Sequence, residues 1–430
     1  MHGPRDQSVD LLVIGAGIAG LWILDAAVSR GLSAVAVECD ALGAGQSVCA
    51  QGIIHGGLKY ALRERDLDAA GSISAMPETW RHLHDGTATD GPDLRAATLS
   101  SPCTWIWRTD SLASRLGFLG AKAALKTRPR SVDDAERPPL LRTAPGSVLR
   151  VDEPVFDTRS VLAAIASRHE GRIARVDGPE AVELASRGGD IERVILRRTV
   201  SSDDAADVEA GFDGEHVVLR PRCVVLAAGT GNEGLLSRLG LDASIAQRRP
   251  LHMTLLRATD LPPMFGHCVD GNRTRVTITS GRDADGRTVW QLGGELAERG
   301  VERDSATQIA TAATELAAVL PDLDLGSFDD AAWSTYRVDR AERRTGGGLR
   351  PDDAVVVPHH DGRLLVAWPT KWALAPRLAA AVLAAMPAEI AQTPSPPVDL
   401  SPLPVPPVAD FPWENRTWTP HRDVRSVARA

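Results

Sequence analysis

Residues 10–23 read Asp10-Leu-Leu-Val-Ile-Gly15-Ala-Gly17-Ile-Ala-Gly20-Leu-Trp-Ile, an apolar run that passes through three glycines into a helical pattern. The apolar run is typical of a parallel strand that is buried on both faces. Gly15 allows a tight turn, Gly17 lets a diphosphate approach the backbone, and Gly20 lets the strand and helix pack closely. The positive N-terminal end of the helix favours a bound diphosphate. We therefore expect a strand–turn–helix unit that binds a dinucleotide.

A second apolar strand over residues 33–37 ends in an acidic residue, Glu38. Glu38 follows Gly20 by 18 residues, close to the spacing of about 20 that is usual for the acid that binds the ribose hydroxyls of an adenosine. An acid here also argues against a ribose 2′-phosphate, which would require an arginine. The motif therefore predicts NAD or FAD and does not distinguish between them.

The composition predicts a globular protein. The chain has 430 residues, 43% of them hydrophobic, which is enough for two or three domains with sizeable cores. Its formal net charge of −8 gives no basic surface of the kind that binds nucleic acid. The five cysteines show no metal-ligand spacing, so we expect reduced thiols in a cytoplasmic protein and no metal site. No apolar run reaches the length of about 18 residues that a membrane span needs.

A loop rich in small residues follows the second strand. It contains Gly45-Gln46-Ser47 and continues into His55-Gly-Gly-Leu-Lys-Tyr60. The glycine motif, this loop and the His-Gly-Gly-Leu-Lys-Tyr element together resemble the D-amino-acid oxidase and glycerol-3-phosphate dehydrogenase-like superfamily of FAD enzymes. In that family the loop carries the diphosphate and ribityl chain towards the flavin. The resemblance therefore places Gly45, Gln46 and Ser47 beside FAD.

A later strand pattern, residues 217–226, ends in Ala227-Ala228-Gly229. Small side chains at this point would let the backbone pass close to a dinucleotide. Because it follows a complete first motif, the pattern looks like the second FAD-contact motif of the superfamily, and it favours FAD over NAD. The resemblance also places a backbone contact to adenine at Val182.

The remaining segments predict a second layer. Alternating residues between positions 251 and 298 favour antiparallel strands, which would form a substrate-domain sheet over the flavin, with a helix at 305–320 outside it. An Ala-rich helix with Pro376 in its first turn then returns the chain to the FAD domain. In the family this helix points its N-terminus at the flavin. The glycine-rich turn that usually precedes it is replaced here by Trp-Pro-Thr370-Lys371.

The predicted fold class is α/β (α+β overall), a Rossmann-like FAD-binding domain with an inserted antiparallel-sheet substrate domain. We expect the proline-rich C-terminal tail to be poorly packed and available to a partner. The expected boundaries are 1–75, 156–245 and 346–392 for the FAD-binding domain, 76–155 for a substrate or cap segment, 246–345 for the substrate domain and 393–430 for the tail.

Because FAD supplies the redox chemistry, the protein must bind the substrate and manage one proton. His55 is a candidate base, and the alternative is a histidine that only hydrogen-bonds to backbone. Lys371 could hold a substrate carboxylate or stabilise anionic flavin. Arg337 or Arg340 could bind an anionic substrate with two hydrogen bonds, although a salt-bridge network is an equal alternative. Cys49 could join FAD covalently, since a histidine near this place does so in the related dimethylglycine-oxidising enzymes.

The leading hypothesis is an FAD-dependent oxidase or dehydrogenase that transfers hydride to flavin N5 from a small substrate. The substrate classes are hydroxy acids, amino acids, N-methyl amines and polyol phosphates, with oxygen, a quinone or a carrier as electron acceptor. The alternatives are an NAD(P)H-dependent flavin monooxygenase and a non-catalytic FAD-binding subunit of a larger complex. The residues expected to contact FAD are Gly15, Ala16, Gly17, Ile18, Ala19, Gly20, Glu38, Cys39, Gly45, Gln46, Ser47, Val182, Ala228, Gly229, Thr370 and Lys371.

Overall fold

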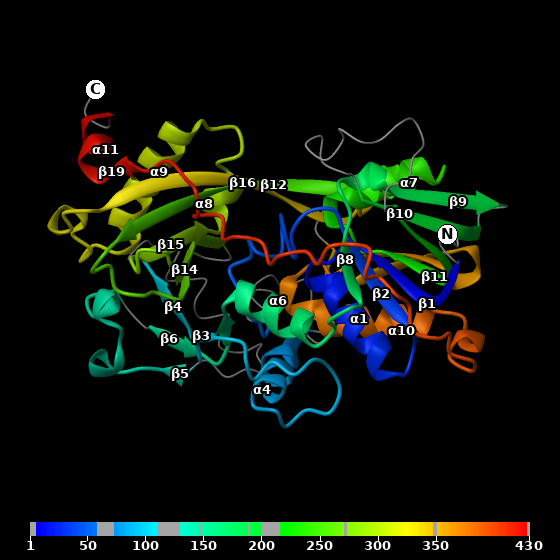
Figure 1. The fold of residues 1–430 in the computed structure, drawn as a ribbon. Helices are drawn as coiled ribbons and strands as arrows, with labels where there is room; N and C mark the ends of the chain where they lie inside the picture. Colours follow the sequence, from blue (N-terminus) through cyan, green and yellow to red (C-terminus); the bar gives the residue numbers. More distant parts are fainter. Residues whose placement is uncertain are drawn as a thin grey trace.

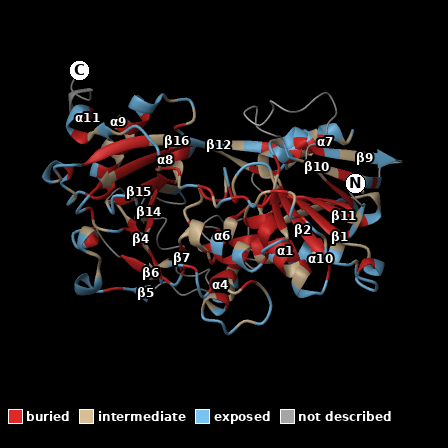
Figure 2. Ribbon diagram, viewed as in Figure 1, coloured by how far each residue is buried: buried red, intermediate tan, exposed pale blue. Residues whose placement is uncertain are grey.

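Two large β-sheets dominate the fold, and Figure 1 shows them at opposite ends of the molecule. The computed structural model describes residues 6–57, 73–109, 130–145, 148–187, 190–198, 216–270, 273–346 and 351–427. Figure 2 shows that the buried residues gather in the sheets and in the helices packed against them. None of the helices in these ranges is long and apolar enough to span a membrane.

The first sheet carries the glycine turn, and its central strands are parallel as predicted. A hairpin of β9 (Val182–Arg187) and β10 (Asp190–Arg197) extends this sheet, because β10 pairs antiparallel with β11 (His216–Leu226), the strand that precedes Ala227. Across the sheet the order is β17 (Val355–His359), β18 (Leu364–Trp368), β11 (His216–Leu226), β1 (Gln7–Ile14), β2 (Ala34–Glu38) and β8 (Ile173–Arg175).

Helices cover one face of this sheet. The helix after the glycine turn, α1 (Ile18–Ser29), packs against α10 (Ala375–Ala385) and α6 (Thr158–Ser167). The helix α6 begins after Asp157, whose Oδ1 accepts a hydrogen bond of 2.7 Å from Ser160 N. On the other face lie the β9–β10 hairpin and α7 (Asn232–Arg238).

The second sheet is mainly antiparallel, as expected, and α9 (Ser305–Val319) packs against it. Among the described strands of this sheet, one pair is parallel: β13 (Gly266–Asp270) with β4 (Thr104–Arg108), which lies in the predicted cap segment. Its order is β19 (Thr419–Pro420), β16 (Ala332–Arg343), β12 (Ala246–Ala258), β15 (Thr288–Gly293), β14 (Arg273–Arg282), β13 (Gly266–Asp270), β4 (Thr104–Arg108), β6 (Leu149–Val151) and β5 (Arg130–Ser131).

Smaller elements complete the fold. The strands β3 (Leu99–Ser101) and β7 (Val155–Phe156) form a two-stranded sheet of their own. The helix α4 (Met76–His84) buries Trp80, which stacks on Trp372 with ring centroids 4.7 Å apart. The short helix α8 (Glu295–Glu298) follows β15, and α11 (His421–Val427) follows β19.

The expectation of a poorly packed tail is wrong. Figure 1 shows the C-terminal segment, coloured orange to red, running from the first sheet to the second. Ser395 bonds to Asp10 of β1, Val408 pairs with Leu42, and Trp413 is buried. The prolines prevent regular structure over most of the segment, but they do not prevent side chains and backbone from packing on both sheets.

Replacing Ser395 by alanine tests this attachment. Asp10 is fully buried and accepts hydrogen bonds from Ser395 N at 3.0 Å and Ser395 Oγ at 2.8 Å. Loss of the hydroxyl should destabilise the protein by about 1–3 kcal/mol, because a buried carboxylate loses a donor. Ser401→Ala, at an exposed position, is the control. Equal midpoints of thermal unfolding for the two variants would contradict the attachment.

Candidate active site

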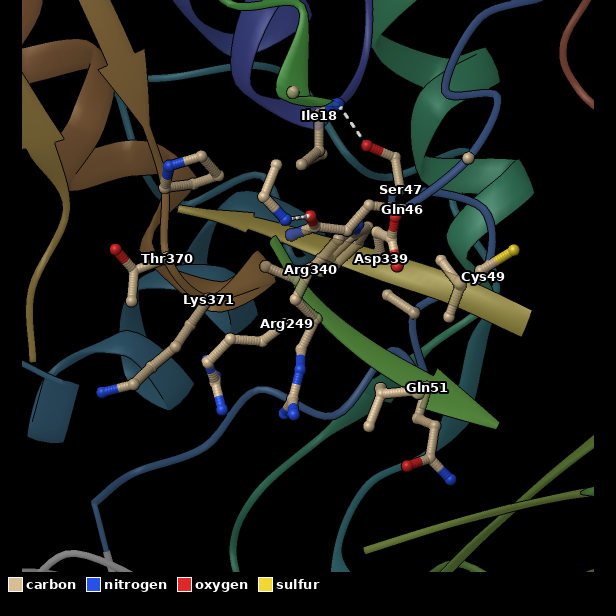
Figure 3. Close-up of a pocket in the computed structure, with 18 of the residues that line it drawn as sticks. Ile18, Gln46, Ser47, Cys49, Gln51, Arg249, Asp339, Arg340, Thr370 and Lys371 are labelled. Atoms are coloured by element: carbon tan, nitrogen blue, oxygen red, sulfur yellow. Dashed lines mark hydrogen bonds between the residues drawn. The ribbon is translucent and has the colours of Figure 1, made fainter. Parts of the chain in front are cut away.

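A large cavity lies where the two sheets meet, and residues from both line it (Figure 3). Several predicted residues are among those that line it: Gly17, Ile18, Ala19, Gly45, Gln46, Ser47, His55, Ala228, Gly229, Arg337, Thr370 and Lys371. The other predicted cofactor residues do not line the cavity itself: Gly15, Ala16, Gly20, Glu38, Cys39 and Val182.

The glycine turn leaves no room for side chains. Gly15 has φ of +102°, and a β-carbon there would lie 2.7 Å from Ala227 O. A β-carbon at Gly20 would lie 1.8 Å from Gly15 O. The end of β11 therefore packs directly on the turn, which explains why small residues occur at both places in the sequence.

The N-terminus of α1 is suited to an anionic group. The cap residue of this fully described helix is Gly17, which provides no side-chain cap, and the first turn holds no acidic residue. Ser47 Oγ accepts a hydrogen bond of 3.0 Å from Ile18 N, which holds the small-residue loop against the helix start. At Gly45 an added β-carbon would meet no described atom within 4 Å, so the loop backbone is open there. These features fit a dinucleotide diphosphate.

Glu38 lies beside the same turn. Its carboxylate accepts hydrogen bonds from Ala16 N at 2.7 Å and from Cys39 N at 2.9 Å. Burial raises the pKa of this carboxyl, and the backbone N–H donors partly oppose the shift. Val182 begins β9 and is buried, with its carbonyl accepting a hydrogen bond from Arg238. Ribose and adenine contacts at Glu38 and Val182 stay predictions.

The segment before α10 forms the wall of the cavity opposite the loop. Thr370 has φ of +59°, and its hydroxyl donates to Asp353 O at 2.7 Å. Lys371 Nζ donates a hydrogen bond of 2.9 Å to Asp352 O, and Lys371 is 9% exposed. The backbone of Thr370 adopts a left-handed conformation, which glycine usually supplies. The chain therefore makes the turn before the helix without the glycines that the family pattern has.

His55 pairs with a carboxylate that sequence analysis missed. His55 Nδ1 lies 3.3 Å from Glu153 Oε2, and Glu153 Oε1 accepts a hydrogen bond of 2.6 Å from Gly56 N. The side chain of Glu153 is 3% exposed and that of His55 is 22% exposed. Glu153 carries no motif and stands far from His55 in sequence, so only the fold reveals the pairing.

The arginines of β16 face in opposite directions. The guanidinium of Arg337 donates hydrogen bonds to the carbonyl oxygens of Val301 and Arg303, in the segment between α8 and α9. Arg340 is three positions later and therefore lies on the other face of the strand. It stands directly opposite Arg249 of β12, and Figure 3 shows the two side chains next to each other.

Both arginines of this pair have acidic partners. Arg249 Nη2 lies 3.3 Å from Glu342 Oε2, in a pair whose carboxylate is almost fully buried. Arg340 Nη2 lies 3.1 Å from Glu298 Oε1, which is half exposed. The sequence suggested a salt-bridge network as one alternative for Arg340, and the structure gives Arg340 an ion pair with Glu298. Arg249 was not among the predicted site residues.

Cys49 is not suited to the covalent link with FAD that the sequence allowed. Burial raises the pKa of the Cys49 thiol to about 11, so it is protonated at neutral pH and poorly suited to forming a covalent bond with a cofactor. Lys59 and Tyr60 of the His-Gly-Gly-Leu-Lys-Tyr element lie outside the described residues. The sequence also predicted no metal site, yet His55, Glu153 and His267 bring potential ligand atoms within 4.8 Å of one another.

Comparison with known proteins identifies close relatives. The family described as FAD dependent oxidoreductase (DAO) matches residues 10–381. A probable FAD-dependent oxidoreductase of Pseudomonas aeruginosa is 40% identical over 416 residues, which are 96% of this chain and 99% of that protein. A crystal structure of an FAD-dependent oxidoreductase from the same organism has a TM-score of 0.76 at 36% identity, over 96% of this chain and 99% of that one.

More distant structures share the fold alone. A glycine oxidase from Geobacillus kaustophilus has a TM-score of 0.57 at 15% identity and covers 92% of this chain and 98% of its own. The match extends over both sheets, so the arrangement of the two sheets is common to these proteins.

Proposed function

Because this chain belongs to the DAO family of FAD-dependent oxidoreductases, we propose that it oxidises a small amino or hydroxy acid whose carboxylate binds Arg340. The observation that carries this proposal is that one cavity contains both His55, paired with a buried carboxylate, and the adjacent Arg249 and Arg340. A base and a fixed cation are what such a substrate requires. A distant structure of the same fold is named as a glycine oxidase, which agrees with an amino acid substrate.

Residues of the chain would bind the cofactor and accept the proton that the substrate loses. FAD, when bound, accepts the hydride and supplies the redox chemistry. The glycine turn and the N-terminus of α1 would hold its diphosphate, and Glu38 its ribose. Glu153 beside His55 Nδ1 favours the tautomer with the proton on Nδ1 and stabilises the imidazolium. The lone pair on His55 Nε2 can then take the proton from a substrate amine or hydroxyl.

Arg340 is the proposed carboxylate partner. Its guanidinium presents N–H donors in a planar fork, a geometry that matches a carboxylate accepting two parallel hydrogen bonds. Arg249 stands opposite, and like charges that face each other across a ladder repel. A bound carboxylate would relieve this repulsion. Lys371, at the start of the segment leading to α10, is a further proposed cation of the cavity.

Anaerobic mixing with candidate substrates tests the function. The oxidised-flavin absorbance of the purified protein should bleach with an amino acid or a 2-hydroxy acid, and less readily with N-methyl amines that lack a carboxylate or with glycerol phosphate. Bleaching by NADPH alone would instead favour a flavin monooxygenase. Turnover that appears only in a co-purified complex would favour an FAD-binding subunit. Reoxidation by air, a quinone or a protein carrier then identifies the acceptor.

Replacing Arg340 by methionine should raise KM for the carboxylate substrate by about 10- to 100-fold, as a lost hydrogen bond to a charged group costs about 1.5–3 kcal/mol. Arg337→Met removes the same group from the opposite face of β16, where the guanidinium contacts backbone carbonyls. It should change KM little. Steady-state kinetics of both variants decide the point, and a larger effect at Arg337 would contradict the assignment.

A further inference from the structure

Two imidazoles and a carboxylate from distant parts of the chain meet beside the cavity. His55 follows the small-residue loop, Glu153 follows β6 and His267 lies in β13. One potential ligand atom from each lies within 4.8 Å of the others. The rings of His55 and His267 have centroids 5.5 Å apart. The proposed reaction uses His55 and Glu153, but it gives no role to His267.

We propose that His55, Glu153 and His267 form a binding site for Zn²⁺ and that the metal inhibits the enzyme. Two imidazole nitrogens and one carboxylate oxygen are donors that zinc accepts, with a fourth position left open. Two ligands of one tetrahedral zinc ion lie about 3.3–3.5 Å apart, given bonds of about 2.0–2.2 Å. His55 Nδ1 and Glu153 Oε2 already have this separation, at 3.3 Å.

The surroundings orient two of the three donors. His267 is 1% exposed, and its Nδ1 lies 2.9 Å from Thr277 Oγ1, so Nε2 is the nitrogen that would bind the metal. Hydrogen bonds of this kind fix the ring of a metal-binding histidine. Gly56 N holds Glu153 Oε1, which directs Oε2 to His55. Because His55 lines the cavity, an ion has an entry path from it.

Zinc binding and base function exclude each other at His55. Without metal, the proton of the neutral imidazole stays on Nδ1, and Nε2 has the lone pair. When zinc bonds to Nδ1, the proton of the neutral ring is on Nε2, which can no longer accept one from the substrate. The inhibition rests on the proposed function of His55, whereas the binding of zinc does not.

Direct titration of the holoenzyme tests the site. FAD-loaded protein, dialysed against EDTA and then against metal-free buffer, is titrated with ZnCl₂ in a calorimeter. We expect one equivalent of zinc to bind, and His267→Gln to weaken the affinity by about 10- to 100-fold or more. His82→Gln is the control, because His82 is exposed and lies near only one acid, Glu78, in the described chain. Failure of the wild-type protein to bind one equivalent would refute the site.

The flavin content and the thermal midpoint of His267→Gln show whether this variant folds. If it does not fold, a second variant tests the site. Thr277→Val removes the partner of His267 Nδ1 and should weaken zinc binding by about 10-fold. Unchanged affinity in both folded variants would overturn the proposal. In turnover assays zinc should inhibit the wild type, EDTA should reverse the inhibition, and His267→Gln should resist it. Zinc that binds at these residues without slowing turnover would refute the inhibition and the base role of His55 while keeping the site.

Discussion

Replacing Gly20 by alanine is expected to abolish FAD binding and to destabilise the protein by at least about 3 kcal/mol, at the upper end of overpacking costs. The added β-carbon would lie 1.8 Å from Gly15 O and 3.2 Å from Val13 Cγ1. The first contact is with backbone of the turn itself, so relief requires α1 to move away from β1. That movement would carry the N-terminus of α1 away from the place where the diphosphate binds.

A matched control exists in another helix. Gly234 lies within α7, and a β-carbon there would meet no described atom within 4 Å. Gly234→Ala should therefore be neutral or stabilise the protein by up to about 1 kcal/mol, because alanine favours helix. The flavin-to-protein ratio after purification and the midpoint of thermal unfolding measure both effects. Full flavin content in Gly20→Ala would contradict the close packing of helix and strand.

Replacing His55 by glutamine is expected to slow flavin reduction by about 100- to 10,000-fold, the usual contribution of a general base. Since His55 lies beyond the glycine turn, the FAD content should stay near that of the wild type. Imidazole accepts a proton only in its neutral form, so the wild-type rate should fall as the solution becomes acidic. Stopped-flow measurement of anaerobic reduction against pH should show this loss in the wild type and not in the variant.

A substitution of Glu153 gives a second test of the role of His55. Glu153→Gln keeps an acceptor for Gly56 N but removes the negative charge beside His55. We expect a smaller loss of rate than in His55→Gln, because His55 keeps its ring but loses the carboxylate that orients it. If His55→Gln retains the wild-type rate and pH profile, the base is another group and the assignment fails.

The strand–turn–helix unit could be predicted because its physics is local. The glycine spacing, the acid at Glu38 and the small residues at Ala228 each follow from a single strand–turn unit. The first-turn proline Pro376 was predictable for the same reason, since a helix terminus is determined by neighbouring residues.

The grouping of His55, Glu153, Arg249 and Arg340 around one cavity could not be predicted, because it depends on pairing between distant strands. Strand periodicity places Arg337 and Arg340 on opposite faces of β16, but only the register with β12 shows that Arg340 stands opposite Arg249. Glu153 and His267 reach His55 through β6 and β13, which the sequence does not connect. The packing of the tail has the same origin, since Ser395 bonds to Asp10 at the opposite end of the chain.

The proposed function requires that the enzyme recognise its substrate by the carboxylate. The most direct measurement is the anaerobic rate of flavin reduction by the best acid of the panel and by its neutral amide, in the wild type and in Arg340→Met. We predict that the wild type reduces its flavin much faster with the acid and that the variant loses this preference. Equal rates for acid and amide in the wild type, or reduction by NADPH with no response to any acid, would contradict the claim.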